Sequence, residues 1–316
     1  MKKFILHTLA FLALSALLVA LFHLLLLRPR KQLFTLPGHI TTAYLGNSTV
    51  ECAVNDSLLP GAFNFGAGAE TLDYVYAKIK SLKQQNPALD TIVIATDDIL
   101  LFKTSNFNGE TKNIYFIDTF TPADWYMNLK EYTFNKIFSY IRYPYSLAKI
   151  KHLIKARRHP ESVQLNKTGI GGYIPLYQDQ LAADMAERHA KGPAAPKNID
   201  GFPAVNRYYL DRIVAYCHDR DMTLLYLTTP KHQTLWNDTV YREIHRRYYP
   251  QIPLIDCTRF AYPDSCFGDC IHLNHKGARI FTQQLTRLIR RSACTQNDVT
   301  PDPTATDPEI SVSAPK

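Results

Sequence analysis

The chain alternates short apolar runs with stretches of helical spacing, and this alternation limits its fold more than any other feature of the sequence. The apolar runs cover residues 40–45, 91–95, 223–227 and 252–255. Between and after them, apolar side chains recur every three or four positions in residues 72–82, 210–217 and 280–289, which predicts amphipathic helices. Strands that alternate with helices favour a mainly parallel sheet with helices on both faces. The sequence therefore predicts an α/β fold.

The first 31 residues predict a membrane anchor. Residues 4–27 carry no formal charge and are rich in Leu and Ala, and about 20 apolar residues suffice to cross a bilayer. The run ends in Leu-Leu-Leu-Leu-Arg-Pro-Arg-Lys, which lacks the small-residue site at which a signal peptide is cleaved. We therefore expect an uncleaved single-pass transmembrane helix within residues 1–31, with the lipid bilayer as its partner.

The side of the membrane on which the rest of the chain lies is indicated only by cysteines. Two lysines before the apolar run nearly balance the three basic residues of 28–31, so the positive-inside rule does not choose an orientation. Cys257, Cys266 and Cys270 lie within fourteen residues of one another, a spacing that permits a local disulfide in an oxidising compartment. This cluster favours an extracytoplasmic soluble domain.

Residues 102–203 interrupt the alternation and predict an insertion in an α/β domain that spans 32–294. Eleven aromatic residues lie between positions 115 and 145, and a basic segment follows at 149–158. These features fit either a helical subdomain with its own aromatic core, or a cover over a substrate site with aromatic faces for sugar or lipid. Residues 295–316 hold four prolines and no aromatic residue, which predicts a disordered tail.

Two segments carry candidate chemistry, and the first is Gly46-Asn47-Ser48 at the end of the first apolar run. A serine at a tight turn between a strand and a helix projects its hydroxyl above the edge of the sheet. Backbone N–H groups at the start of the helix can then face an oxyanion. The same three residues are also an ordinary turn and helix N-cap signature, so this segment alone does not predict catalysis.

The second segment is Asp269-Cys-Ile-His272, just before the last amphipathic stretch. The carboxylate and the imidazole are three positions apart, so one short loop can present both. Asp269 would fix the tautomer of His272 and leave the other ring nitrogen to take a proton from a hydroxyl. A surface loop with a capping Asp is the alternative for this segment.

A metal cluster of Cys266, Cys270, His272 and His275 is disfavoured, because known zinc sites usually separate their ligand pairs by about a dozen residues or more.

Taken together, the two segments resemble the SGNH (GDSL-type) hydrolase and acyltransferase superfamily, in particular its membrane-anchored bacterial members. The resemblance runs from about residue 41 to residue 288 and implies a flavodoxin-like three-layer α/β/α fold. Ser48 matches the family's nucleophile after the first strand, and Asp269 and His272 match its Asp-x-x-His near the C-terminus. The resemblance therefore implies that Ser48, Asp269 and His272 form a catalytic triad.

The resemblance also implies an oxyanion hole, and here the sequence departs from the family pattern. Gly66 and Gly68 lie in a segment similar to the second family block, where a glycine amide joins the amide of Ser48 as a donor. The third block normally supplies an Asn side chain, but this chain has Thr96 followed by Asp97 and Asp98. Since an ionised carboxylate repels an oxyanion, either Thr96 donates at this block, another residue does, or the hole has only two donors. Losing one donor costs roughly 10²–10³ in rate.

These features predict a membrane-anchored serine esterase or O-acyltransferase that acts on an acylated carbohydrate of the cell envelope and needs no cofactor or metal. The alternative is an SGNH-fold binding or assembly protein of the envelope with a degraded site, whose partners the sequence does not name. The formal net charge of +8 favours anionic surfaces. The basic segment is short and lacks a nucleic-acid-binding motif, so no nucleic acid is expected as a partner.

Overall fold

The computed structural model describes residues 2–27, 34–104, 121–130, 171–192, 197–237 and 239–294. Most of the aromatic segment at 115–145, the whole basic segment at 149–158 and the predicted disordered tail at 295–316 lie outside the described residues. Of the aromatic segment, the structure describes only helix α7 (Pro122–Lys130) and the residue before it.

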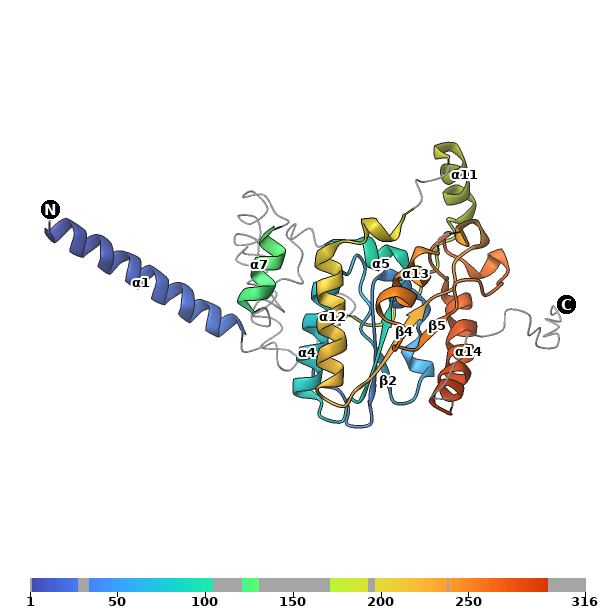
Figure 1. Cartoon of the computed structure of the whole chain (residues 1–316), viewed down its shortest axis with the longest axis horizontal. Coiled ribbons are helices and arrows are strands. Elements are labelled where there is room, and N and C mark those ends of the chain that lie inside the picture. The colour runs from blue at the N-terminus through green and yellow to red at the C-terminus, as the bar shows by residue number, and fades with distance from the viewer. Residues whose placement is uncertain are drawn as a thin grey trace.

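A five-stranded parallel sheet forms the centre of the molecule (Figure 1). Its strands are β1 (Thr42–Leu45), β2 (Ala62–Asn64), β3 (Thr91–Ala95), β4 (Thr223–Thr228) and β5 (Leu254–Asp256). They lie in the order β2-β1-β3-β4-β5, and each neighbouring pair is parallel. This is the strand order of flavodoxin-like folds. The predicted α/β class and parallel sheet are confirmed.

Helices cover both faces of the sheet. The helices of the body are α3 (Ser48–Ala53), α4 (Leu72–Gln85), α5 (Asp98–Phe102), α11 (Leu181–Lys191), α12 (Ala204–His218), α13 (Val240–Tyr248) and α14 (His275–Cys294). Short 3-10 helices lie at Asp56–Leu58, Ile199–Gly201, Gln233–Leu235 and Asp264–Cys266. Buried residues of α4, α12 and α13 pack on one face of the sheet, and those of α3 and α14 pack on the other. The three predicted layers, helix, sheet and helix, are therefore present.

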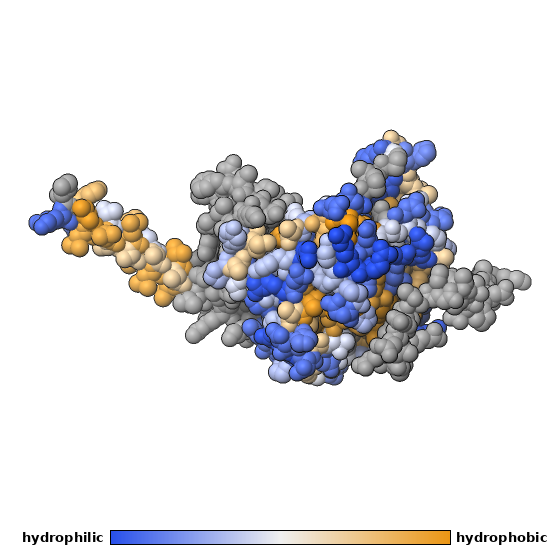
Figure 2. Space-filling view, viewed as in Figure 1, coloured by the Kyte–Doolittle hydropathy of each residue, from blue (hydrophilic) through white to orange (hydrophobic). Residues whose placement is uncertain are grey.

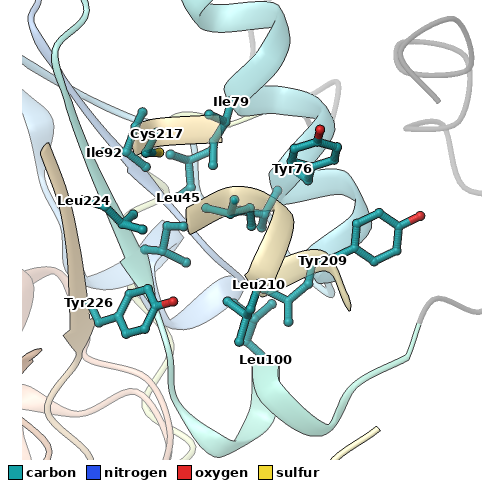
Figure 3. Packing of buried hydrophobic residues seen from close by; sticks show 14 of the residues in the cluster. Leu45, Tyr76, Ile79, Ile92, Leu100, Tyr209, Leu210, Cys217, Leu224 and Tyr226 are labelled. Atoms are coloured by element: carbon teal, nitrogen blue, oxygen red, sulfur yellow. The ribbon is translucent and has the colours of Figure 1, made fainter. Parts of the chain in front are cut away.

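The strands divide their side chains between two cores because successive residues of a strand point to opposite faces. In β3, Ile92 and Ile94 join the core beneath α4 and α12, while Val93 and Ala95 join the core beneath α3 and α14. Figure 3 shows part of the first core, in which Ile79 of α4 lies near Ile92 of the sheet and Leu210 of α12 lies near Leu100 of α5. With both faces buried, the strands are continuously apolar, as expected for a parallel sheet.

The N-terminal helix α1 (Lys2–Leu27) stands apart from these cores. Its stretch Lys2–Leu21 is long and apolar enough to cross a membrane, with a mean hydropathy of 2.4, and none of it is buried in the protein. At 1.5 Å per residue the 26 residues of α1 extend about 39 Å, more than the hydrocarbon thickness of a bilayer.

The local disulfide that the cysteine spacing permits is absent from the structure. Cys257, Cys266 and Cys270 are buried free thiols in the structure. Burial raises the pKa of each thiol above its ordinary value, so they behave as small apolar core residues. The cysteine spacing therefore gives no support to an extracytoplasmic location, which stays a prediction.

Candidate active site

The candidate site lies where the strand order reverses, at the carboxyl edge of the sheet. Strand β1 has β2 on one side and β3 on the other, and in open α/β sheets ligands bind in the crevice outside this edge. The loops that follow β1, β2 and β3 begin at Gly46, Phe65 and Thr96 respectively. All three segments that the sequence identified for the nucleophile and the oxyanion hole thus meet at one place.

Ser48 is presented by a tight turn between β1 and α3. Gly46 has φ of +149°, and a Cβ there would lie 2.6 Å from the Cβ of Ala95 on β3, so only glycine lets the two strands approach. Asn47 caps α3, because its side-chain oxygen accepts the N–H of Thr49 at 2.9 Å. Ser48 is then the first residue of α3, a position whose N–H has no acceptor within the helix.

The last helix contacts the C-terminal end of α3, the helix that begins at Ser48. The Oγ1 of Thr282 on α14 accepts the N–H of Asn55 at 2.9 Å, and its hydroxyl proton is shared between the carbonyl oxygens of Ala278 at 2.7 Å and Ala53 at 3.2 Å. These bonds satisfy groups at the C-terminal end of α3. The position of Ser48 therefore depends on a helix more than two hundred residues further along the chain.

His272 contacts both Ser48 and Asp269, although Ser48 is 224 residues away in the sequence. Its Nε2 lies 2.8 Å from Ser48 Oγ, and its Nδ1 lies 2.8 Å from Asp269 Oδ2. The imidazole and the carboxylate are both partly buried, with side-chain exposures of 19% and 28%. The structure thus brings together the three residues that the sequence nominated as a triad.

The Asp269 carboxylate is oriented by its own loop. Its Oδ1 accepts the backbone N–H groups of Ile271 at 2.7 Å and of His272 at 2.8 Å. Burial alone would raise the pKa of Asp269, but its hydrogen bond with His272 and its electrostatic attraction to that ring, together with these two N–H groups, hold that pKa below its usual value. Asp269 is therefore ionised at neutral pH and faces the ring nitrogen that must carry a proton if Nε2 is to accept one from Ser48.

The Asp97 carboxylate, which would repel an oxyanion if it faced one, instead accepts hydrogen bonds from residues of the turn that contains Ser48 and from the start of α5. It is fully buried and accepts hydrogen bonds from Asn47 Nδ2 at 3.3 Å, Thr49 Oγ1 at 3.0 Å and the N–H of Leu100 at 2.9 Å. Asp97 thus supports the residues on either side of Ser48 and caps α5. The Asn at position 47 and the Asp at 97 form a matched donor and acceptor pair.

The predicted oxyanion donors differ in what their groups already contact. The N–H of Gly66 donates to Asn64 Oδ1 at 2.8 Å, so an oxyanion at that amide would have to share or displace this bond. A Cβ on Gly68 would lie 3.3 Å from a carboxylate oxygen of Glu51, which places Gly68 beside a negative side chain. Thr96 is buried at the end of β3, and its N–H pairs with the carbonyl oxygen of Leu227 at 2.9 Å. The hydroxyl of Thr96, rather than its N–H, is therefore the group that could donate a hydrogen bond to an oxyanion.

Two features that sequence reasoning missed hold the loop after β2. Lys78 of α4 is completely buried, donates to the carbonyl oxygen of Phe65 at 2.9 Å and forms an ion pair with the buried Glu70. A segment inside the predicted insertion, residues 171–180, also contacts both halves of the site. Its Gly172 N–H donates to Asn64 O at 2.8 Å, and its Gln180 N–H donates to Gly268 O at 2.8 Å.

A cluster of charges next to the site was also missed. The Asp98 carboxylate forms an ion pair with the buried Lys231 of the loop after β4, and a second with Lys197 at 3.1 Å. Burial would raise the pKa of Asp98, but the two lysines outweigh it and hold the pKa below its usual value. The sequence holds one signal for this cluster. Asp98 follows β3 and Lys231 follows β4, and these two strands are neighbours in the sheet.

The metal alternative finds no support among the described residues. No group of three or more His, Cys, Asp or Glu side chains gathers there as metal ligands. His272 is engaged by Ser48 and Asp269, whereas His275 Nδ1 lies 3.2 Å from the carbonyl oxygen of Leu176. The two histidines of this hypothetical cluster therefore make different contacts.

Comparison with known proteins gives structural likeness only. No family model and no curated protein matches the sequence. A candidate acylhydrolase from Bacteroides fragilis is similar to 79% of this chain over 86% of its own length, at 11% identity and a TM-score of 0.34. A Streptococcus pneumoniae protein described as a candidate platelet activating factor is similar to 88% of the chain over 99% of its own length, at 11% identity and a TM-score of 0.33. Similarity at this level assigns neither family nor function, so the chemistry rests on the residues of the site.

Proposed function

We propose that the protein is a serine esterase or O-acyltransferase of the SGNH type, with Ser48 as nucleophile, His272 as general base and acid, and Asp269 as the residue that orients His272. The observation that carries the proposal is the continuous hydrogen-bonded path from Ser48 Oγ to His272 Nε2 at 2.8 Å and from His272 Nδ1 to Asp269 Oδ2 at 2.8 Å. Such a path lowers the cost of removing the hydroxyl proton as the oxygen attacks.

The reaction proceeds in two halves. Ser48 Oγ attacks the acyl carbon of an ester while His272 Nε2 takes the hydroxyl proton, and the carbonyl oxygen becomes an oxyanion. The intermediate then collapses, its C–O bond to the alcohol breaks, and His272 returns the proton to the departing alcohol oxygen. Water or a sugar hydroxyl next gives its proton to His272 and attacks the acyl-enzyme, which releases Ser48.

The oxyanion would be held by the Ser48 N–H and the Thr96 hydroxyl, with Gly68 or Gly66 as a further donor. Their positions support this choice, because Ser48 begins α3 shortly after β1, Thr96 directly follows β3, and β1 and β3 are adjacent strands. Gly66 is the weaker candidate, since its N–H is bonded to Asn64 Oδ1. No step in this scheme needs a cofactor or a metal.

The substrate and the location belong to the same proposal. The apolar helix α1 supports a single-pass anchor, followed by an α/β domain at residues 32–294 that carries the insertion of about 102–203. We place this domain outside the cytoplasm, where an acylated carbohydrate of the cell envelope would be its ester substrate. Whether water or a sugar accepts the acyl group depends on how well the site excludes water.

The competing function is a binding or assembly protein of the envelope that keeps this fold without turnover. The observation that favours it is the Gly66 N–H, which is already bonded to Asn64. A hole that lacks this donor and the family's Asn side chain would stabilise an oxyanion poorly.

A fluorophosphonate probe separates the two functions, because it reacts with a serine only when the serine is activated. We expect the full-length protein in detergent to be labelled, and the Ser48→Ala variant not to be. Ser57→Ala is the matched control, since Ser57 is an exposed serine whose hydroxyl donates to Asn55 and should not affect labelling. Absence of labelling in wild-type protein with a cooperative thermal transition would reject the enzyme and favour the binding protein.

A further inference from the structure

A cleft with a volume of about 600 Å³ opens beside the candidate active site. It lies between α13, the start of α5 and the loops that follow β4 and β5. Its charged lining consists of Asp98, Lys197, Arg242, Glu243, Arg246 and Arg259. Four cationic side chains therefore face two anionic ones. In Figure 2, strongly hydrophilic residues gather over the region that α13 and the neighbouring loops occupy in Figure 1.

Several of these charges are already compensated by the protein. Asp98 is paired with Lys197 and with the buried Lys231. Arg242 Nε donates to Asp256 Oδ2 at 2.6 Å, and Asp256 lies behind the cleft at the end of β5. Each of these pairs joins side chains from segments that are separate in the sequence, and so ties together the parts of the chain that surround the cleft.

Arg246 and Arg259 differ from the other cations of the cleft. Both are exposed, and within the described part of the chain neither makes an ion pair with a carboxylate. Arg259 Nη2 donates to the carbonyl oxygen of Trp236 at 3.2 Å, which steadies the guanidinium and leaves its other N–H groups available. Glu243 is the one acidic side chain of the lining that faces them without a partner within hydrogen-bond distance among the described residues. The excess of positive charge is thus carried by two guanidinium groups, which match the planar geometry of carboxylate and phosphate oxygens.

The cleft and the triad share structural parts. The adjacent residues Asp97 and Asp98 face opposite ways, Asp97 toward Asn47 and Thr49 beside the nucleophile, and Asp98 into the cleft. On the other side, the N–H of His232 donates to the carbonyl oxygen of Cys270 at 3.0 Å, which ties the loop after β4 to the loop that carries the triad histidine. The cleft and the candidate triad therefore lie on the same, carboxyl edge of the sheet.

We propose that this cleft is a subsite for an anionic group of the substrate, a phosphate or a carboxylate, which Arg246 and Arg259 bind while the ester to be cleaved lies at Ser48. The proposal rests on the proposed function and narrows its substrate to a negatively charged acylated carbohydrate. The neutralised pairs around Asp98 and Arg242 keep the cleft in shape when no anion is bound. The guanidinium groups of Arg246 and Arg259, which make no ion pair with a carboxylate of the described residues, supply the recognition.

The test measures binding without turnover, so its result does not depend on the triad. Full-length wild-type protein in detergent is titrated by calorimetry with glucose 6-phosphate, glucuronate and neutral glucose. We expect at least one of the two anionic sugars to bind and glucose not to bind detectably. Arg246→Glu and Arg259→Glu should each weaken that binding about tenfold or more, because a lost hydrogen bond to a charged group costs roughly 10- to 100-fold in affinity.

Arg247→Glu is the matched control. Arg247 is the neighbour of Arg246 on α13, carries the same charge and is exposed, but it faces the Tyr248 ring rather than the cleft. Its variant should bind the anionic sugar within about twofold of wild type, since it leaves every cleft contact in place.

Binding of glucose 6-phosphate alone identifies a phosphate site, and binding of glucuronate alone identifies a carboxylate site. Either result supports the proposal. Equal loss of affinity in Arg247→Glu would overturn it, because the effect would then be one of overall charge. So would equal binding of neutral glucose, or no binding of either anion up to about 10 mM, a concentration that would detect even a millimolar site. Fluorophosphonate labelling of the same preparation reports separately on the proposed catalytic function.

Discussion

Asp269→Asn tests the proposed proton path with the smallest change of shape. Asp269 Oδ1 accepts two backbone N–H groups, from Ile271 at 2.7 Å and from His272 at 2.8 Å. An asparagine keeps these bonds only if its carbonyl oxygen takes the Oδ1 position. Its NH₂ group then occupies the Oδ2 position, 2.8 Å from His272 Nδ1.

That arrangement favours the wrong tautomer of His272, because Nδ1 lies 2.8 Å from the Oδ2 position and 3.0 Å from the Oδ1 position. The NH₂ group at the nearer position is a donor, so Nδ1 accepts from it and the ring proton moves to Nε2. An N–H then points at Ser48 Oγ across 2.8 Å, where an acceptor is needed. The reversed orientation of the amide would set its NH₂ group against two backbone N–H groups, at a cost of about 1–3 kcal/mol for each bond lost. The rate should therefore fall by about 10³–10⁴, as expected when a serine triad loses its correct tautomer.

The assay is the second-order rate constant for fluorophosphonate labelling of the full-length protein, together with hydrolysis of p-nitrophenyl acetate. Asp264→Asn is the matched control, because Asp264 also contacts a histidine ring, His232 Nε2 at 3.2 Å, but its side chain is 69% exposed and outside the triad. This control should react at the wild-type rate. A rate for Asp269→Asn within about threefold of wild type, in protein that melts normally, would refute the proton path.

Three further predictions concern the neighbourhood of the triad. Thr96→Val should lower the rate of ester hydrolysis by about 10²-fold with little change in melting temperature, because it removes a hydroxyl oxyanion donor while keeping the shape. Gly46→Ala should destabilise the fold by about 2–4 kcal/mol in urea unfolding, since its Cβ would lie 2.6 Å from the Cβ of Ala95. Lys231→Met should lower the free energy of unfolding by about 2–4 kcal/mol at pH 7, because it leaves the buried Asp98 carboxylate with Lys197 alone. The pKa of Asp98 is lowered in the folded state, so its contribution is present above its unfolded pKa of about 4 and is lost as the pH falls toward the folded pKa.

Each of these has a control in the same chain. Thr229→Val alters a buried hydroxyl with no hydrogen-bond partner among the described residues and should leave the rate unchanged. Gly38→Ala adds a Cβ that meets nothing within 4 Å and should cost little. Lys191→Met removes an exposed ion pair with Glu187 and should change stability by less than about 1 kcal/mol. For Lys231→Met, a free energy of unfolding that still falls as steeply below pH 4 as in wild type would contradict the role given to the pair.

Local patterns were enough to predict most of the strands and helices. The apolar run at 91–95 became β3, and the helical spacing at 72–82 became α4, because a buried strand and an amphipathic helix each have a period visible in a few residues. Strand β2, by contrast, contains only Ala62, Phe63 and Asn64. Three residues that end in asparagine show no such period, so the edge of the sheet beyond β1 was not predicted.

Contacts that depend on the lateral order of strands could not be read from the sequence. Asp98 and Lys231 are 133 residues apart and meet because β3 and β4 are neighbours. Lys78 is buried within a helix whose spacing predicted only an apolar face. Ser48, Asp269 and His272 were nominated as a set through a family resemblance, since neither of their two short segments is specific alone.

The separation of Ser48 from its histidine has a consequence for biosynthesis. Chains grow at about 5–20 residues per second, so the 224 residues between the two take roughly 10 to 45 s to add. Throughout that interval the serine has no base, and the helix that steadies the end of α3 through Thr282 has not yet been made. Under the proposed mechanism, a nascent chain that has not yet reached His272 is therefore inert toward esters, and reactivity requires Ser48 and His272 together in the folded domain.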